Sequence, residues 1–365
     1  MASVSKLSLG GSIQNTTGAW NGTFATDNAM FLKIFGGEVF SSFERYTVTD
    51  GKHRVRNISS GKTAQFPFTG RNEAHYFTPG TDILVDNAAK ENSGVGTDVT
   101  PGALGLVQVA EKTINIDDLL ISTCFIDDLD LAKSHYDYRG PFSKEIGRAL
   151  AFAYDKAVFE AALTSALGNT SAADPFQSSQ KLKTSNGTMS ANTSKQIIDS
   201  IYEAAQGFDE RYVPEDERYV FVRPREYNKL LKDSEATTAG SLGSSLVHRD
   251  YTGGGNGNLA ENFVVKCAGM TVVKTPHLPI LDRSLDAGAA NVKAWDGQNN
   301  DYHGNWTDTI ALCWHPEAVG TVKLKDVTME SEYLIARQGT LMVGKMAVGH
   351  GGLRPECVAM IEAVA

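Results

Sequence analysis

Five aspartates between Ile116 and Leu131 are the densest group of side chains in this chain that could do chemistry. Clustered carboxylates can bind divalent cations, or share a proton when the pKa values of two neighbours are pushed apart. Their spacing matches no calcium-binding loop. The sequence therefore favours a solvated acidic face, with ion pairs to a neighbouring molecule as the alternative. The five are Asp117, Asp118, Asp127, Asp128 and Asp130.

A second candidate is Gly61-Lys62-Thr63, which is similar to the end of a phosphate-binding loop. That motif needs a glycine five residues before its second glycine, and Arg56 stands there. The segment also begins a strand rather than a helix, so no helix N-terminus would face a phosphate. Another glycine-rich stretch, Gly253 to Gly257, neither follows a strand nor opens a helix, which is typical of a flexible loop.

The cysteines and histidines show no spacing of a metal or catalytic site. The four cysteines lie far apart, which favours buried, reduced thiols over a zinc site or a disulfide framework. The eight histidines include no His-x-x-x-His pair, and the chain has no Gly-x-Ser-x-Gly motif. We therefore predict no catalytic, cofactor-binding or metal-binding residues. The cysteines are Cys124, Cys267, Cys313 and Cys357.

One histidine has a distinctive position. His350 lies among Gly349, Gly351 and Gly352, and this glycine density predicts a turn with positive φ angles. In such a turn the imidazole would hydrogen-bond to the turn backbone. A pH-sensitive contact is the alternative role.

These residues must be positioned by a chain that mixes helices and strands, which makes the fold class α+β. Pro141 to Leu167 carries the strongest helical pattern, because apolar residues recur at helical spacing between a proline in the first turn and Gly168. The first 28 residues are polar and indicate an arm without a core of its own. Further helices are predicted at 193–206 and 225–232, and strands at 53–68 (two short ones), 106–115, 218–222, 262–275, 309–314 and near Val319 and Leu341.

Composition limits the possible functions. The chain has 365 residues, 41% of them hydrophobic, with neither a membrane-length apolar run nor a secretory signal, so we expect a soluble protein that acts where it is made. A net charge of −9 and a pI near 5.4 argue against a surface that grips nucleic acid. The same charge suits a wall that encloses nucleic acid, because the polymer would slide past it.

Several sequence segments closely resemble the major capsid proteins of short-tailed, T-seven-like bacteriophages, in the same order along the chain. Two lie near the C-terminus, AVGTVKLKDVTME (318–330) and MAVGHGGLRPE (346–356). Three lie near the N-terminus, FLKIFGGEVFSSF (31–43), RNISSGKTAQFPFTGR (56–71) and HYFTPG (75–80).

The resemblance implies the shell fold named after phage Hong Kong ninety-seven, and a subunit that assembles as hexamers and pentamers into an icosahedral head. It further implies a scaffolding protein and a portal protein as partners, double-stranded DNA inside, no membrane, and assembly in the host cytoplasm. The expected parts are an N-terminal arm (1–52), an extended loop (53–118), a peripheral domain with a spine helix at about 141–167 (119–191 and 314–365) and an axial domain (192–313).

Basic residues of the extended loop and of the C-terminal strands are expected to form ion pairs between subunits with the acidic group. The basic residues are Lys52, Arg54, Arg56, Lys62, Arg71, Lys323 and Lys325, and the acidic ones are Asp117, Asp118, Asp127 and Asp128. Two other interpretations stay open from the sequence: a soluble α/β enzyme that binds a phosphate or nucleotide, and another virion component such as a tail protein.

Overall fold

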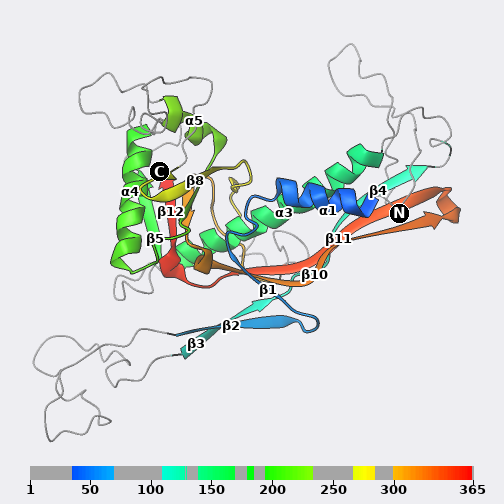
Figure 1. Ribbon diagram of the computed structural model, residues 1–365, viewed down its shortest axis with the longest axis horizontal. Helices are drawn as coiled ribbons and strands as arrows, with labels where there is room; N and C mark the ends of the chain where they lie inside the picture. Colours follow the sequence, from blue (N-terminus) through cyan, green and yellow to red (C-terminus); the bar gives the residue numbers. More distant parts are fainter. Residues whose placement is uncertain are drawn as a thin grey trace, which may run out of the picture.

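The computed structural model describes residues 35–69, 109–127, 129, 139–168, 179–184, 194–232, 266–283 and 299–363. Residues 1–34 of the predicted N-terminal arm, Arg71, Asp128, Asp130 and the glycine-rich loop at 253–257 lie outside these ranges. The described part has an elongated shape, with a long ribbon and helix at one end and a mixed sheet at the other (Figure 1).

The elongated end is built on a helix that runs along a long antiparallel ribbon. Helix α3 (Arg139–Gly168) has 30 residues, which corresponds to about 45 Å, and matches the predicted spine helix within two residues. The ribbon consists of β10 (Val319–Leu334) and β11 (Gly339–Gly352), flanked by β1 (Arg54–Asn57) on the β10 side and β4 (Leu120–Asp127) on the β11 side. Helix α1 (Phe35–Tyr46) packs on both α3 and β10.

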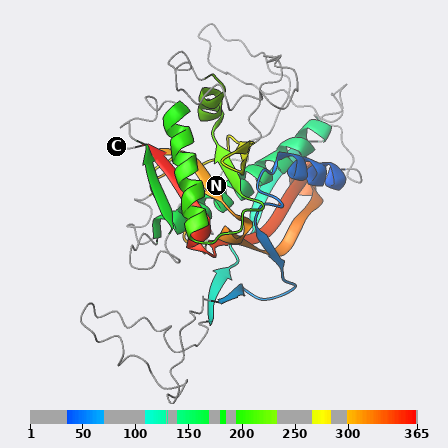
Figure 2. The same cartoon turned by 60° about the vertical axis from the view of Figure 1, so that its left-hand side comes forward.

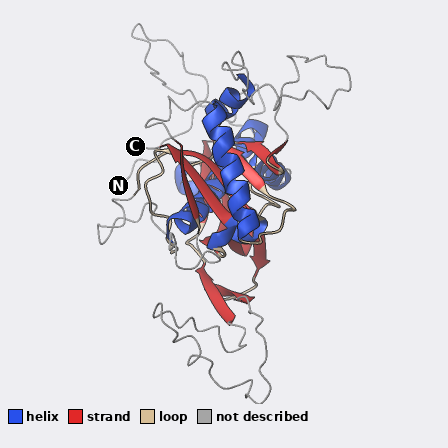
Figure 3. Ribbon diagram, turned by 90° about the vertical axis from the view of Figure 1, so that its left-hand side faces the viewer, coloured by secondary structure: helices blue, strands red, loops and turns tan. Residues whose placement is uncertain are grey.

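The other end is a six-stranded sheet in the order β5-β12-β9-β6-β8-β7. Helix α4 (Ser194–Glu210) lies beside it (Figure 3), and α5 (Pro224–Lys232) follows β6. Phe159 of α3 packs against Phe221 and Trp314, with ring centroids 5.1 and 5.4 Å away, and so joins helix and sheet in one core. The strands are β5 (Gln180–Thr184), β6 (Tyr219–Val222), β7 (Lys266–Cys267), β8 (Met270–Lys274), β9 (Thr309–Trp314) and β12 (Val358–Ala363).

Two features of this sheet differ from expectation. The single strand predicted at 262–275 is interrupted, because Ala268 and Gly269 have φ angles of 50° and 78° and form a tight turn between β7 and β8. Strands β5 and β12 come from ranges that we expected in the peripheral domain; β12 pairs with both β5 and β9, so the two strands form one end of the six-stranded sheet.

A two-stranded hairpin extends from the base of the ribbon (Figures 1 and 2). It consists of β2 (Thr63–Thr69) and β3 (Val109–Asn115), paired from Thr63↔Asn115 to Thr69↔Val109, and lies within the range predicted for the extended loop. Its base has a small hydrophobic core separate from the main one. The buried members of this small core are Ala64, Phe66, Ile114, Ile116, Val322, Ala347 and Leu353.

The predicted turn around His350 is wrong, because this segment is the end of strand β11. Among the described residues the glycines with positive φ lie elsewhere, at Gly51, Gly61 and Gly269. Gly349 has a different reason to be glycine: a Cβ atom there would lie 1.9 Å from the carbonyl oxygen of Asn115. Strand β3 ends directly against the backbone of β11, and only a residue without a side chain permits that approach.

Candidate functional site

Three of the predicted basic residues lie around the base of the hairpin and are exposed: Arg54, Arg56 and Lys62. Arg56 donates a hydrogen bond to the carbonyl oxygen of Gln65 in β2. Arg54 lies 4.0 Å from Glu317 of its own chain, which is a loose ion pair. The structure therefore gathers these charges at the β1 edge of the four-stranded sheet and leaves them accessible.

The other basic residues are placed differently from one another. Lys52 is half-buried, donates to the carbonyl oxygen of Val48 at 2.6 Å, and has a pKa lowered by burial. Lys323 is also partly buried, with its Nζ 5.8 Å from the centroid of the Tyr154 ring. Lys325 is exposed on β10. Lys52 and Lys323 thus have contacts inside the chain.

The acidic group is divided by the fold. Asp127 ends β4, and the pairing of β4 with β11 places it beside Gly339, near the ribbon tip. Arg54 pairs beside Gly320 at the ribbon base, so the length of β10 between them separates the two charges by about 45 Å. Asp118 is exposed, whereas Asp117 is bound inside the chain.

Asp117 belongs to a polar cluster that the sequence did not reveal. Its Oδ1 accepts a hydrogen bond from the backbone N–H of Asn299 at 2.6 Å, and its Oδ2 accepts one from the hydroxyl of Tyr302 at 2.7 Å. The Tyr302 hydroxyl in turn accepts a bond from the backbone N–H of His350 at 3.0 Å. Burial raises the pKa of Asp117, and these hydrogen bonds oppose the shift. The only sequence signal for the cluster is a polar run at 299–302, which is typical of any loop.

His350 takes neither predicted role. Its Nδ1 lies 2.9 Å from the Thr321 hydroxyl on the neighbouring strand, and the side chain is 1% exposed. Burial, together with nearby His53 and Lys323, lowers the pKa of His350 to about 3. The imidazole is therefore neutral at physiological pH and does not sense mild acid.

A group of potential metal ligands occurs within the described ranges, but its surroundings disfavour a cation. His315, Glu317 and Cys357 have ligand atoms within 4.8 Å of one another. The Glu317 carboxylate already binds Arg354 at 3.0 Å, with Arg54 also close. Burial raises the pKa of the Cys357 thiol to about 12, which opposes formation of the thiolate that a metal needs. All four cysteines are buried and free, as predicted.

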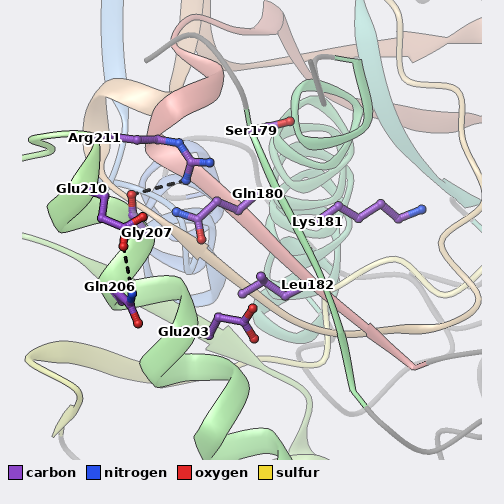
Figure 4. A pocket seen from close by; sticks show the side chains of 9 residues that line it. All are labelled: Ser179, Gln180, Lys181, Leu182, Glu203, Gln206, Gly207, Glu210 and Arg211. Atoms are coloured by element: carbon purple, nitrogen blue, oxygen red, sulfur yellow. Dashed lines mark hydrogen bonds between the residues drawn. The ribbon is translucent and has the colours of Figure 1, made fainter. Parts of the chain in front are cut away.

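A groove between β5 and α4 has a volume of about 440 Å³ (Figure 4). Its walls mix charges of both signs, including Lys181, Glu203, Glu210 and Arg211. Lys181 is paired with Glu362 at 3.1 Å, and the Arg211 guanidinium donates to the carbonyl oxygen of Gly207. The mixed charges select no ligand class. Separately, Gly61-Lys62-Thr63 leads into strand β2, as predicted, and no helix begins there.

A spine helix along a long ribbon, a projecting hairpin and a separate mixed sheet define the class of tailed-phage shell subunits. A capsid chain of the cyanophage P-SCSP1u has a TM-score of 0.66 over 87% of this chain and 88% of its own, at 34% identity. A chain of the mature capsid of bacteriophage PhiM1 shares the fold with a TM-score of 0.59 over 93% and 89%, at 16% identity.

Sequence comparison then gives the family. The major capsid protein of Escherichia phage T7 is 31% identical over 377 residues, which covers 97% of this chain and 98% of the relative. The model of Gp10A-like major capsid proteins matches residues 65–362. This chain belongs to the Gp10A-like family of major capsid proteins.

Family membership confirms the predicted family, the α+β tailed-phage fold and the role as a capsid protein. The protein is a structural component that assembles with copies of itself into the shell of the virion. The interpretations as a phosphate-binding enzyme and as a tail protein are replaced by this assignment. In the described ranges, none of the helices combines the length and apolar composition that crossing a membrane requires.

Proposed function

We propose that copies of this chain assemble as hexamers and pentamers into an icosahedral head that encloses double-stranded DNA, with a scaffolding protein and a portal protein as partners. The observation that carries the proposal is the β2–β3 hairpin, which projects from the ribbon with only a small core at its base. Because isolated hairpins are marginal in water, such a hairpin gains most by packing on a neighbouring copy. The net charge of −9 supports enclosure of DNA rather than tight binding to it.

The proposed domains of the subunit keep the residue boundaries expected from the sequence. Residues 1–52 are the arm, 53–118 the extended loop, 119–191 and 314–365 the peripheral domain, and 192–313 the axial domain. Strands β5 and β12 work with the axial sheet in this scheme, because their hydrogen bonds lie there. The subunit acts by shape and contact, without catalysis.

We also propose ion pairs between subunits. Exposed Arg56 and Lys62 lie at the ribbon base, whereas Asp127 lies near the tip, too far away for a pair within one chain. Opposite charges at separate ends of the four-stranded sheet suit a head-to-tail contact between copies. Each pair is worth little alone, but many repeated contacts act together in a closed shell. Arg54, Lys325, Asp118, Arg71 and Asp128 are the further candidates, while Lys52, Lys323 and Asp117 are less suited because their own chain binds them.

The assembly proposal is tested by expressing the chain with and without the scaffolding protein of its phage. We expect closed shells of uniform diameter with the scaffolding protein, and fewer or irregular particles without it, as seen by negative-stain electron microscopy. Monomers or small open rings under both conditions would contradict the proposal.

Reversing charge at the hairpin base tests the ion pairs. We expect the Arg56→Glu, Lys62→Glu double variant to lower shell yield several-fold, because attraction across the contact becomes repulsion, and the deficit should shrink at high salt. Sedimentation of shells from matched expression cultures measures the yield. The control for the change in net charge is the double variant Lys195→Glu, Lys266→Glu, which reverses two exposed lysines on α4 and β7. Unchanged yield and particle stability in the double variant would remove these residues from the interface.

A further inference from the structure

In the segment 299–302, a single side chain binds both backbone groups at the end of strand β3. The side-chain amide of Asn300 accepts a hydrogen bond from the backbone N–H of Asn115 at 3.0 Å. The same amide donates one to the carbonyl oxygen of Asn115 at 2.7 Å. One side chain thus satisfies both backbone groups of the last residue of β3, as a neighbouring strand would.

The next two residues of the chain are also held by hydrogen bonds. The carbonyl oxygen of Ile116 accepts a hydrogen bond from the side chain of Asn299 at 2.9 Å. The backbone N–H of Ile116 donates one to the carbonyl oxygen of Lys62. The N–H of Asp117 donates to the carbonyl oxygen of Val348 in β11 at 3.0 Å. The chain therefore leaves the hairpin in one fixed direction.

The segment that makes these bonds is anchored on the spine helix. The backbone of Arg283 donates to Gly304 at 2.9 Å, and that of Trp306 donates to Leu281 at 3.2 Å. The guanidinium of Arg283 binds the carboxylate of Glu160, a side chain of α3 that is 1% exposed. Helix α3 and the hairpin base are connected through this segment, although they pack on opposite faces of the ribbon.

Two observations place them on opposite faces. Along β11, a Cβ at Gly349 would meet Asn115 of the hairpin base, whereas a Cβ at Gly352 would meet Ser165 of α3. Residues at odd separations in a strand point to opposite sides. The ribbon therefore lies between the helix and the hairpin, and the segment 299–306 passes from one side to the other.

We propose that Asn299, Asn300 and Tyr302 are positioning residues for assembly, which set the direction of the β2–β3 hairpin relative to the spine helix. We call these three residues the clamp. The inference deepens the proposed function, since it assumes that the hairpin contacts a neighbouring copy. Asn300 contributes most, because its side chain alone binds both backbone groups of Asn115 and also donates to Asp117 at 3.2 Å.

Hydrogen exchange followed by mass spectrometry tests the positioning in the full-length, unassembled protein. In Asn300→Ala we expect a peptide covering 109–117 to exchange about tenfold faster, because the side-chain bonds that hold the N–H and the carbonyl oxygen of Asn115 are lost, while peptides of α3 and β9 exchange as in the parent. Asn300→Asp should be worse, since it keeps the acceptor, loses the donor and places a charge beside Asp117. Asn57→Ala is the control: an exposed asparagine at the end of β1. Unchanged exchange at 109–117 in Asn300→Ala would overturn the proposal.

Shell formation with the scaffolding protein is the second measurement. We expect Asn300→Ala to fold but to form fewer or misshapen shells, and Asn57→Ala to form normal ones. Faster exchange with normal shells would show that hairpin direction does not matter for assembly. If the parent chain itself forms no shells, the proposed function fails, and the exchange data still decide whether the clamp exists.

The connection to the spine helix has its own variant. Replacing the buried pair together, Glu160→Gln with Arg283→Met, avoids an uncompensated charge in the core. If the helix anchors the clamp, exchange at 109–117 rises about threefold or more, although neither residue touches the hairpin. If only peptides around 160 and 283 change, the clamp acts without the helix, and that part of the proposal is wrong.

Discussion

Replacing Gly349 with alanine should reduce shell yield at least tenfold. The new Cβ would lie 1.9 Å from the carbonyl oxygen of Asn115 and 3.0 Å from the Cα of Ile116, both backbone atoms that no rotamer can move away. The hairpin base and β11 must therefore separate by more than about 1 Å, which breaks the bond from Asp117 to Val348. Overpacking of this kind costs about 1–3 kcal/mol and moves the backbone. Electron microscopy of particles and the melting temperature of the unassembled chain measure the two effects.

Gly351 provides the matched control in the same strand. A Cβ there would lie 3.1 Å from Cγ1 of Ile114, which is a side-chain atom that can move. Gly351→Ala should therefore lower the yield much less. Equal yields for Gly349→Ala and the parent would show that the close crossing of β3 and β11 has no role in assembly.

Removing the Asp155 carboxylate should destabilise the subunit by about 3–5 kcal/mol. This buried side chain of α3 accepts hydrogen bonds from the N–H groups of Val48 and Thr49, at 2.8 and 3.2 Å, and from the Thr49 hydroxyl. It also pairs with Nδ1 of His277 at 2.6 Å. Asp155→Ala leaves all these donors without a partner in the core. Urea unfolding of the unassembled chain measures the loss.

Glu145→Ala is the control on the same helix, since that carboxylate is 70% exposed and, among the residues that the structure describes, forms only a surface pair with Arg148. Its effect should stay below about 0.5 kcal/mol. If both substitutions shift the urea midpoint equally, Asp155 does not hold the chain after α1 against the spine helix.

The sequence predicted elements well where the signal was local. The helix at 141–167 is found at 139–168, and the strand at 309–314 has its predicted ends. Both have uninterrupted apolar patterns and clear boundaries, so neighbours in the sequence decide them. The arrangement of the elements came from the sequence segments that resemble the family, because periodicity alone does not determine it.

The failures share a cause in long-range contacts. A glycine indicates either a positive φ or a close approach, and only the position of Asn115 against Gly349 shows which one applies. Asp117 and Asp118 look alike in the sequence, but the path of the chain after β3 places the first against Tyr302 and leaves the second exposed. Asn299 and Asn300 carry no spacing signature, because their role depends on a strand about 185 residues earlier.

The ribbon also has a mechanical consequence. Its base is held between the spine helix and the hairpin, while its tip, where β10 turns into β11, lies about 45 Å away. A rotation of about 5° at the base would carry the tip through roughly 4 Å over such an arm. The same fold can thus meet partners at slightly different angles, as rings of five and six require.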